Sequence, residues 1–328
     1  MKLWIWKKTT IIILENPIRN DVQIMTRGFV TLATGSDKYY EMAVNMLRSF
    51  RYHNPGAKMA ILCDKENEYT AEFDDAVVLD NVHGSYKDKF RLLADSPYDE
   101  NIFIEPDCFI YRNLDFFWDI LSAESDYSSF GWNDSPLNIW FKSEESQNEI
   151  KKYLPDVESF PLFNPGYFFI RKGEKCEKMY RDCMDIADYI MNNPILKNDA
   201  GLLCNGKLRD DPVLSLAMEV NGFVCNAKPK AGKCIFLPSK YHIDDIDFDG
   251  GLLDVTDKNG NKFVDCSLIH FSTRKANEEG LYLWQRKIIG SVCKGKRGLY
   301  IRLWDNKIML AFCNIYMKLK TKFKRLFK

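Results

Sequence analysis

Two carboxylates, Glu105 and Asp107, stand one residue apart between two apolar runs. The runs are typical of buried strands, and acids that interrupt a buried sheet are costly unless they are paired or bind a cation. Spacing of i and i+2 at a strand end can direct both side chains to one point. Hard divalent cations take oxygen ligands, and Mg²⁺ or Mn²⁺ usually bridges carboxylates to substrate phosphates. We therefore expect a divalent-metal site here, with a solvated acidic turn as the alternative.

The elements that must position these acids alternate between strand and helix. Short apolar runs predict strands at 28–34, 58–63, 76–79 and 101–104, and helical spacing of apolar residues predicts helices at 39–52 and 86–94. Such alternation implies βαβ units and a mostly parallel sheet, hence an α/β fold. Ligands of these folds bind at the carboxyl ends of the strands, where residues 34–37, Asp64 and 105–107 stand.

The pattern loosens after residue 126. Further strands are predicted at 166–170 and 264–270, and further helices at 176–191 and 211–221. No linker rich in Pro, Gly or Ser divides the chain. We therefore expect one catalytic domain at 25–285, with an N-terminal segment at 1–24 and a tail at 286–328. The ten cysteines include no C-x-x-C pair, which favours reduced thiols in a cytosolic protein over a disulfide framework.

The formal net charge is zero, but the charges are unevenly distributed. From Arg286 to the C-terminus, thirteen Lys and Arg residues stand against a single acid, Asp305. Apolar residues recur in this tail at helical spacing, and a basic amphipathic helix of this kind lies in a membrane interface. We expect residues 286–328 to bind an anionic membrane surface and not nucleic acid, because the aromatics interleave with aliphatic residues. A helix packed on the core with a solvated basic face is the alternative.

Five segments, in a fixed order along the chain, carry a resemblance to a known family. They are FVTLATGSDKYYEMAVNMLRSFRYHNP (29–55), YKDKFRLLADSPYDENIFIEPDCFIYRNLDFFW (86–118), FNPGYFFI (163–170), DDPVL (210–214) and LIHFS (268–272). Together they resemble the GT-A glycosyltransferases, and most the family-eight type, in which the second segment leads into the metal-binding DxD motif. The resemblance implies a Rossmann-like, mixed but mostly parallel sheet flanked by helices, here followed by C-terminal basic amphipathic helices.

The resemblance also implies a nucleotide-sugar donor, Mn²⁺ or Mg²⁺, and transfer of a hexose to an acceptor hydroxyl. The residues that would contact the nucleotide base are Thr34, Asp37 and Tyr39. Those that would approach the diphosphate or donor sugar are Lys89 or Arg91. The metal ligands would be Glu105, Asp107 and His270. The residues on the sugar and acceptor side would be Asn164, Gly166, Asp210 and Asp211, with Asn164 and the two aspartates as catalytic candidates.

The chain departs from the family pattern in two places. Glu105 replaces the first Asp of the DxD motif, and Thr273 and Arg274-Lys275 stand where the family has Gly and Lys after its His. Three of the candidate residues also have simpler interpretations: a structural His270, a helix-capping Asp210 and a solvated Lys89.

The sequence thus predicts a metal-dependent glycosyltransferase that moves a sugar from a nucleotide sugar to a glycan or lipid-linked acceptor. We expect it to be peripheral on the cytoplasmic face of a membrane and to act in surface-polysaccharide assembly. One alternative is a non-catalytic binding protein with the same fold. Another is a sugar nucleotidyltransferase, but these usually carry a Gly-rich phosphate loop after the first strand, and residues 34–37 contain only Gly35.

Overall fold

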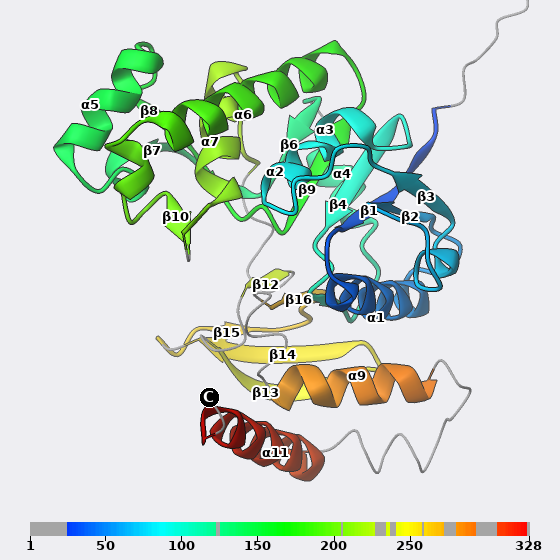
Figure 1. Ribbon diagram of the computed structural model, residues 1–328. Helices are drawn as coiled ribbons and strands as arrows, with labels where there is room; N and C mark the ends of the chain where they lie inside the picture. The colour runs from blue at the N-terminus through cyan, green and yellow to red at the C-terminus, as the bar shows by residue number, and fades with distance from the viewer. Residues whose placement is uncertain are drawn as a thin grey trace, which may run out of the picture.

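The computed structural model describes residues 25–122, 125–204, 206–226, 234–236, 241–257, 259–271, 280–292 and 307–326. The predicted N-terminal segment 1–24, residues 273–275 and part of the tail lie outside these ranges. A six-stranded sheet with the order β3-β2-β1-β4-β9-β6 forms the centre (Figure 1). Its strands are β1 (Arg27–Ala33), β2 (Met59–Cys63), β3 (Asp75–Val78), β4 (Glu100–Ile104), β6 (Tyr127–Ser128) and β9 (Tyr167–Arg171).

The sheet is mixed and mostly parallel, which confirms the predicted fold class. β1 pairs in parallel with both β2 and β4, and β2 pairs in parallel with β3. β9 runs antiparallel to β4 and to β6. The chain leaves β1 toward β2 and β3 and returns on its other side as β4, so the strand order reverses at β1. A crevice for ligands is expected at the carboxyl ends of strands at such a switch.

Helices cover both faces of the sheet, and this is why its strands are apolar without alternation. All five residues of β2 and all five of β4 are buried. One face packs on α1 (Asp37–His53) and α4 (Phe116–Leu121). The other packs on α6 (Glu174–Asn192) and α7 (Asp210–Val220). Successive side chains of β1 point to opposite faces of the sheet. Val30 belongs to the core on the side of α6 and α7, whereas Phe29 and Ala33 belong to the core on the side of α1 and α4.

The predicted helix at 86–94 is present as two short helices, α2 (Lys87–Phe90) and α3 (Leu92–Asp95). The backbone N–H groups of Lys89 and Arg91 bond to the carbonyls three residues earlier. Bonds of this spacing tighten the chain into 3₁₀ geometry, which divides the helix.

A smaller layer lies beneath the main sheet in Figure 1. It contains the three-stranded sheet β12 (Cys234–Phe236), β16 (Leu268–His270) and β5 (Cys108–Ile110), with β5 antiparallel to β16. The predicted strand at 264–270 is therefore too long. Asp265 has φ of 57°, a left-handed conformation outside the region of regular strands, and β16 begins only at Leu268.

The C-terminal part of the described chain adds an antiparallel sheet and two helices. The sheet joins β13 (Tyr241–Asp247), β14 (Leu252–Asp257) and β15 (Lys262–Phe263). α9 (Gly280–Val292) packs on this layer through Trp284, Ile288 and Ile289. α11 (Lys307–Leu326) lies beside α9 (Figure 1). C-terminal helices are thus present as the sequence predicts, although α9 begins before the expected boundary at residue 286.

The structure describes eight further helices and strands. They are η1 (Thr70–Glu72), β7 (Gly131–Pro136), η2 (Leu137–Ile139), α5 (Glu144–Tyr153), β8 (Ser159–Phe163), η3 (Leu196–Asn198), β10 (Leu203–Cys204) and β11 (Lys207–Leu208). No described helix combines the length and apolar content that crossing a membrane requires.

Candidate metal and donor site

Three residues from two distant parts of the sequence meet at the end of β4. Glu105 follows β4, Asp107 precedes β5, and His270 ends β16. A tight turn joins the two acids, because the Cys108 N–H donates to the Glu105 carbonyl at 3.1 Å. The turn is tied to β16 by the Phe271 N–H, which donates to the Asp107 carbonyl at 3.0 Å. Backbone pairing therefore determines that the imidazole lies beside both carboxylates.

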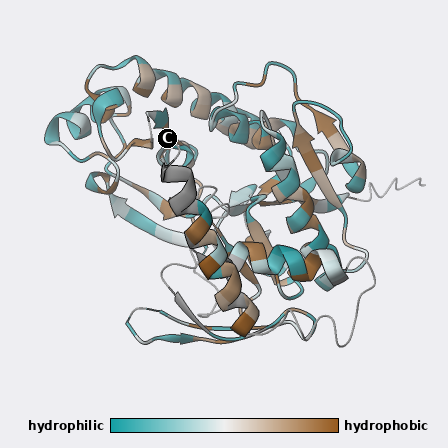
Figure 2. Cartoon of the chain, turned by 60° about the horizontal axis from the view of Figure 1, so that its bottom comes forward, coloured by the Kyte–Doolittle hydropathy of each residue, from teal (hydrophilic) through white to brown (hydrophobic). Residues whose placement is uncertain are grey.

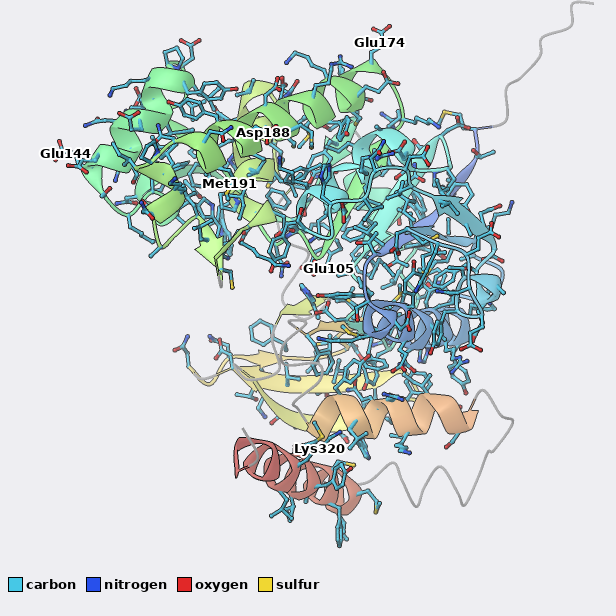
Figure 3. The ribbon with its side chains drawn as sticks, in the orientation of Figure 1. Glu105, Glu144, Glu174, Asp188, Met191 and Lys320 are labelled. Atoms are coloured by element: carbon cyan, nitrogen blue, oxygen red, sulfur yellow. The ribbon has the colours of Figure 1, made fainter. Side chains whose placement is uncertain are left out.

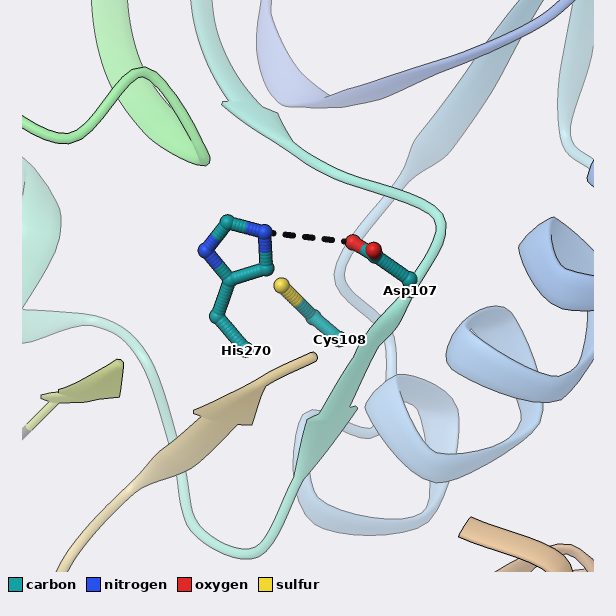
Figure 4. Close-up of side chains that lie close together, drawn as sticks. All are labelled: Asp107, Cys108 and His270. Carbon is teal, nitrogen blue, oxygen red and sulfur yellow. Dashed lines mark ion pairs between the residues drawn. The ribbon is translucent and has the colours of Figure 1, made fainter. Parts of the chain in front are cut away.

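The three side chains are in contact; Asp107 and His270 are buried, and Glu105 is partly exposed. His270 Nε2 lies 2.5 Å from Glu105 Oε2 and 3.2 Å from Asp107 Oδ1. Figure 4 shows the second contact, with the thiol of Cys108 beside the ring. The ligand atoms of Asp107, Cys108 and His270 all lie within 4.8 Å of one another. Figure 3 places Glu105 between the upper layer and the small sheet.

The pKa shifts of these three side chains indicate an excess of negative charge in the cluster. Burial lowers the pKa of His270, but the carboxylates of Glu105 and Asp107 outweigh it and raise this pKa to about 10. Burial raises the pKa of Glu105, but Lys89 and His270 outweigh it and lower this pKa to about 2. Burial raises the pKa of Asp107. A proton on His270 thus compensates part of the negative charge of the two acids.

Lys89 connects this cluster to α7. Its Nζ forms ion pairs with both Glu105 and Asp210, and its side chain is only 8% exposed. Burial lowers the pKa of Lys89, but the two carboxylates outweigh it and raise the pKa above its usual range. Lys89 is therefore charged and fully engaged by two acids.

The donor set fits a divalent cation. Glu105, Asp107 and Asp210 bring three negative charges and Lys89 brings one positive charge. The remaining two negative charges are what a divalent cation balances once His270 is neutral. Carboxylate oxygens suit both Mn²⁺ and Mg²⁺, while an imidazole nitrogen favours the transition metal. Glu105, Asp107 and His270 could therefore hold Mn²⁺.

Asn164 and Gly166 lie behind the ring of His270. The Gly166 N–H donates to Asn164 Oδ1 at 2.9 Å, and Asn164 Nδ2 lies 3.4 Å from His270 Nδ1. A Cβ at position 166 would stand 2.5 Å from ring atoms of His270. The sequence assigned both residues to the sugar and acceptor side, whereas in the structure their contacts are with His270.

A cavity of about 190 Å³ opens next to the cluster. It is lined by Leu32, Thr34, Tyr39, Gly84, Ser85, Tyr86, Lys89, Phe103, Glu105, Pro106, Asp107 and Lys207. Thr34, Tyr39 and Lys89 are thus brought together with the two acids, as the sequence analysis expects. Asp37 and Arg91 are not, since Asp37 pairs with Lys65 at 3.0 Å and the Arg91 side chain pairs with Asp95.

Asp210 and Asp211 occupy the first turn of α7, where the helix dipole favours acids. Their partners differ, because Asp210 pairs with Lys89 while Asp211 accepts two bonds from Arg209 at 2.9 and 2.6 Å. Arg209 lies over the ring of Trp140, 4.6 Å from its centre. Burial raises the pKa of Asp211. Neither aspartate lines the cavity.

Sequence reasoning missed two residues of the site. Asp88 is buried and accepts from Thr34 Oγ1 at 3.1 Å and from the His83 N–H at 2.7 Å, so it holds Thr34 of the cavity wall and the backbone next to Gly84. Lys207 lines the cavity from β11. Asp88 lies in a segment already recognised, but no local pattern distinguishes Lys207 from other surface lysines.

No protein-family model matches this sequence, and no curated protein matches it. Among solved structures, the chain is similar to the glycosyltransferase GlyE of Streptococcus pneumoniae TIGR4, at 12% identity and a TM-score of 0.40 over 61% of this chain and 45% of that one. It is similar to the galactosyltransferase LgtC in complex with donor and acceptor sugar analogues, at 15% identity and 0.40 over 75% and 87%. It is also similar to the bifunctional glycosyltransferase WbbM, at 11% identity and 0.45 over 78% and 47%. The matched region spans less than half of GlyE and of WbbM.

Proposed function

We propose that this chain is a metal-dependent glycosyltransferase that transfers a hexose from a nucleotide sugar to a hydroxyl of a glycan or lipid-linked acceptor. The observation that carries the proposal is the meeting of Glu105, Asp107 and His270 beside the cavity. Two acids and a neutral imidazole form a divalent-metal ligand set, and the cavity offers space next to it for a phosphorylated ligand.

The chemistry requires charge stabilisation at the leaving group. A nucleoside diphosphate departs from the sugar, and negative charge develops on its phosphate oxygens. A divalent cation held by Glu105, Asp107 and His270 would supply positive charge to those oxygens. Lys89 pairs with Glu105 and Asp210 together, so it orients both acids. We assign Thr34 and Tyr39 to the nucleotide side of the cavity.

Asp210 is the acid that best suits the sugar side. Its ion pair with Lys89 connects it to Glu105 through a single side chain. A carboxylate close to the anomeric carbon stabilises oxocarbenium character as the glycosidic bond to the diphosphate breaks. Asp211 pairs with Arg209, and we assign it the role of stabilising the first turn of α7.

We also propose that the tail attaches the protein to an anionic membrane, on the cytoplasmic side. In α11, Cys313 and Met317 are buried, whereas a stripe on the helix stays exposed. The stripe consists of Ile308, Phe312, Ile315, Tyr316 and Leu319, each more than half exposed. Figure 2 shows apolar residues along this helix. The sequence of α11 contains six Lys and Arg residues and no acid, so the charge is complementary to anionic lipid. Such a position suits an acceptor used in surface-polysaccharide assembly.

Donor hydrolysis tests the enzymatic proposal. A panel of nucleotide sugars is incubated with the protein and Mn²⁺, without acceptor, and release of nucleoside diphosphate is measured. We expect release from one donor, its loss with EDTA, and its loss in Asp107→Ala but not in Glu158→Ala, an exposed acid that does not line the cavity. If no donor is hydrolysed and calorimetry shows that none is bound, the result would contradict the proposal and favour the non-catalytic protein with the same fold.

A further inference from the structure

Two lysines line the cavity, and they differ in burial and in ion pairing. Lys89 is buried and shared between Glu105 and Asp210. Lys207 is exposed, and no acidic partner for it occurs in the described part of the chain. Arg91, the other cation expected at the donor, pairs with Asp95 and donates to the Asp80 carbonyl at 2.8 Å. Of the described cations, Lys207 is thus the one that both lines the cavity and is available to a ligand.

Charge balance shows why such a cation is needed. With a divalent cation at Glu105, Asp107 and His270, the charges of the metal and Lys89 equal those of Glu105, Asp107 and Asp210. A donor diphosphate then enters with about two further negative charges that nothing in this cluster compensates. When the glycosidic bond breaks, additional negative charge develops on the phosphate. A further cation in the cavity wall would stabilise that charge.

The local structure explains how Lys207 reaches the cavity. It sits in the hairpin of β10 and β11, where it pairs with Cys204 across the strands. Gly206, with φ of 74°, allows the turn. Leu208 is buried in the core, and Arg209 and Asp210 follow at the start of α7. The backbone of Lys207 is therefore anchored by the adjacent core residue Leu208, while its side chain is a flexible point charge.

We propose that Lys207 is the donor-phosphate cation of this site, binding the diphosphate of the nucleotide sugar and the nucleoside diphosphate that leaves. This inference rests on the proposed function, and it concerns substrate binding by a residue that the sequence analysis did not select. Lys89 then has a positioning role, because its charge is compensated by Glu105 and Asp210.

Inorganic pyrophosphate is a suitable probe, because it presents the diphosphate without base or sugar. Calorimetry in the presence of Mn²⁺ compares the full-length protein with Lys207→Met, Lys207→Arg and Lys197→Met. Lys197 is an exposed lysine outside the cavity and serves as the matched control. We expect Lys207→Met to weaken pyrophosphate binding about ten-fold, the loss of one charge-assisted contact. Lys207→Arg should retain most of the affinity, and Lys197→Met all of it.

Kinetics on the donor that the wild type hydrolyses provides a second readout. Lys207→Met should raise KM and lower kcat together, because the contact strengthens as the diphosphate leaves. Equal pyrophosphate binding by wild type and Lys207→Met would overturn this proposal and leave the glycosyltransferase proposal intact. Failure of the wild type to bind pyrophosphate with Mn²⁺ would overturn both.

Discussion

Gly166 lies against the ring of His270, so closely that a Cβ at position 166 would stand 2.5 Å from Cε1 and Nδ1 of the imidazole. The backbone of residue 166 therefore acts as the back wall for a residue that comes from a strand far along the sequence. The ring of His270 can direct Nε2 toward Glu105 and Asp107 only if residue 166 carries no side chain.

Gly166→Ala should displace the His270 ring and damage the site without removing any ligand. Supports behind a metal ligand typically contribute about 10- to 100-fold in metal affinity or activity, and we expect a loss in this range for Mn²⁺-dependent donor hydrolysis. Gly290→Ala is the matched control, because a Cβ at position 290 meets nothing within 4 Å. Activity of Gly166→Ala equal to that of Gly290→Ala would show that the ring position does not matter.

Lys89→Met should destabilise the fold strongly. The substitution leaves Glu105 and Asp210 buried without their shared cation, and breaking a buried pair from one side costs about 3–5 kcal/mol. Urea denaturation at neutral pH measures the change in the free energy of unfolding. Lys65→Met provides the comparison, since Lys65 pairs with Asp37 on the surface and exposed pairs contribute about 0–1 kcal/mol. Similar effects of the two substitutions would contradict the assigned role of Lys89.

His53 should make the fold less stable in mild acid. Burial lowers its pKa from 6.5 to about 4, so the folded protein holds this imidazole neutral. Between these two values the unfolded chain binds more protons, and the free energy of unfolding falls as the pH falls. Denaturation midpoints measured from pH 7 to pH 4 should show a smaller decline in His53→Gln than in the wild type. His83→Gln, at an exposed position, should leave the decline unchanged.

Phe312→Glu should weaken attachment to anionic vesicles. It places a charge in the middle of the exposed stripe of α11, where a buried Phe would contribute about 1.5–3 kcal/mol to insertion. Flotation with vesicles containing anionic lipid should recover the wild type, and the bound fraction should fall at high salt. Val264→Glu, at a residue 57% exposed in the loop between β15 and β16, is the control. Binding of Phe312→Glu at the wild-type level would exclude α11 as the attachment surface.

Much of the sheet could be predicted because its strands are buried on both faces. β1, β2 and β4 are short apolar runs that end in polar residues, and this pattern has few other interpretations. The strand expected at 264–270 was wrong in its first half. Asp265 adopts a left-handed backbone conformation there, and an aspartate can adopt either conformation, so composition alone does not reveal the break.

Site residues could likewise be predicted where the local sequence identifies them, but not where their role depends on a distant contact. Glu105 and Asp107 could be selected because acids at the end of a buried strand need a partner. The pairing of Lys89 with Asp210 could not, since it depends on how α7 packs beside α2. Lys207 was missed for the same reason, because only the fold brings the β10–β11 hairpin to the cavity. Residues whose role depends on a distant partner need the three-dimensional structure.

Mn²⁺ binding followed by electron paramagnetic resonance tests the central claim most directly, because it depends on neither donor nor acceptor. The free ion is titrated with the full-length protein, with Asp107→Asn and with Glu158→Gln as the control. We predict one tight Mn²⁺ site per chain in the wild type and in Glu158→Gln, and its loss in Asp107→Asn. Equal Mn²⁺ binding by all three proteins, or none by the wild type, would contradict a metal site formed by Glu105, Asp107 and His270.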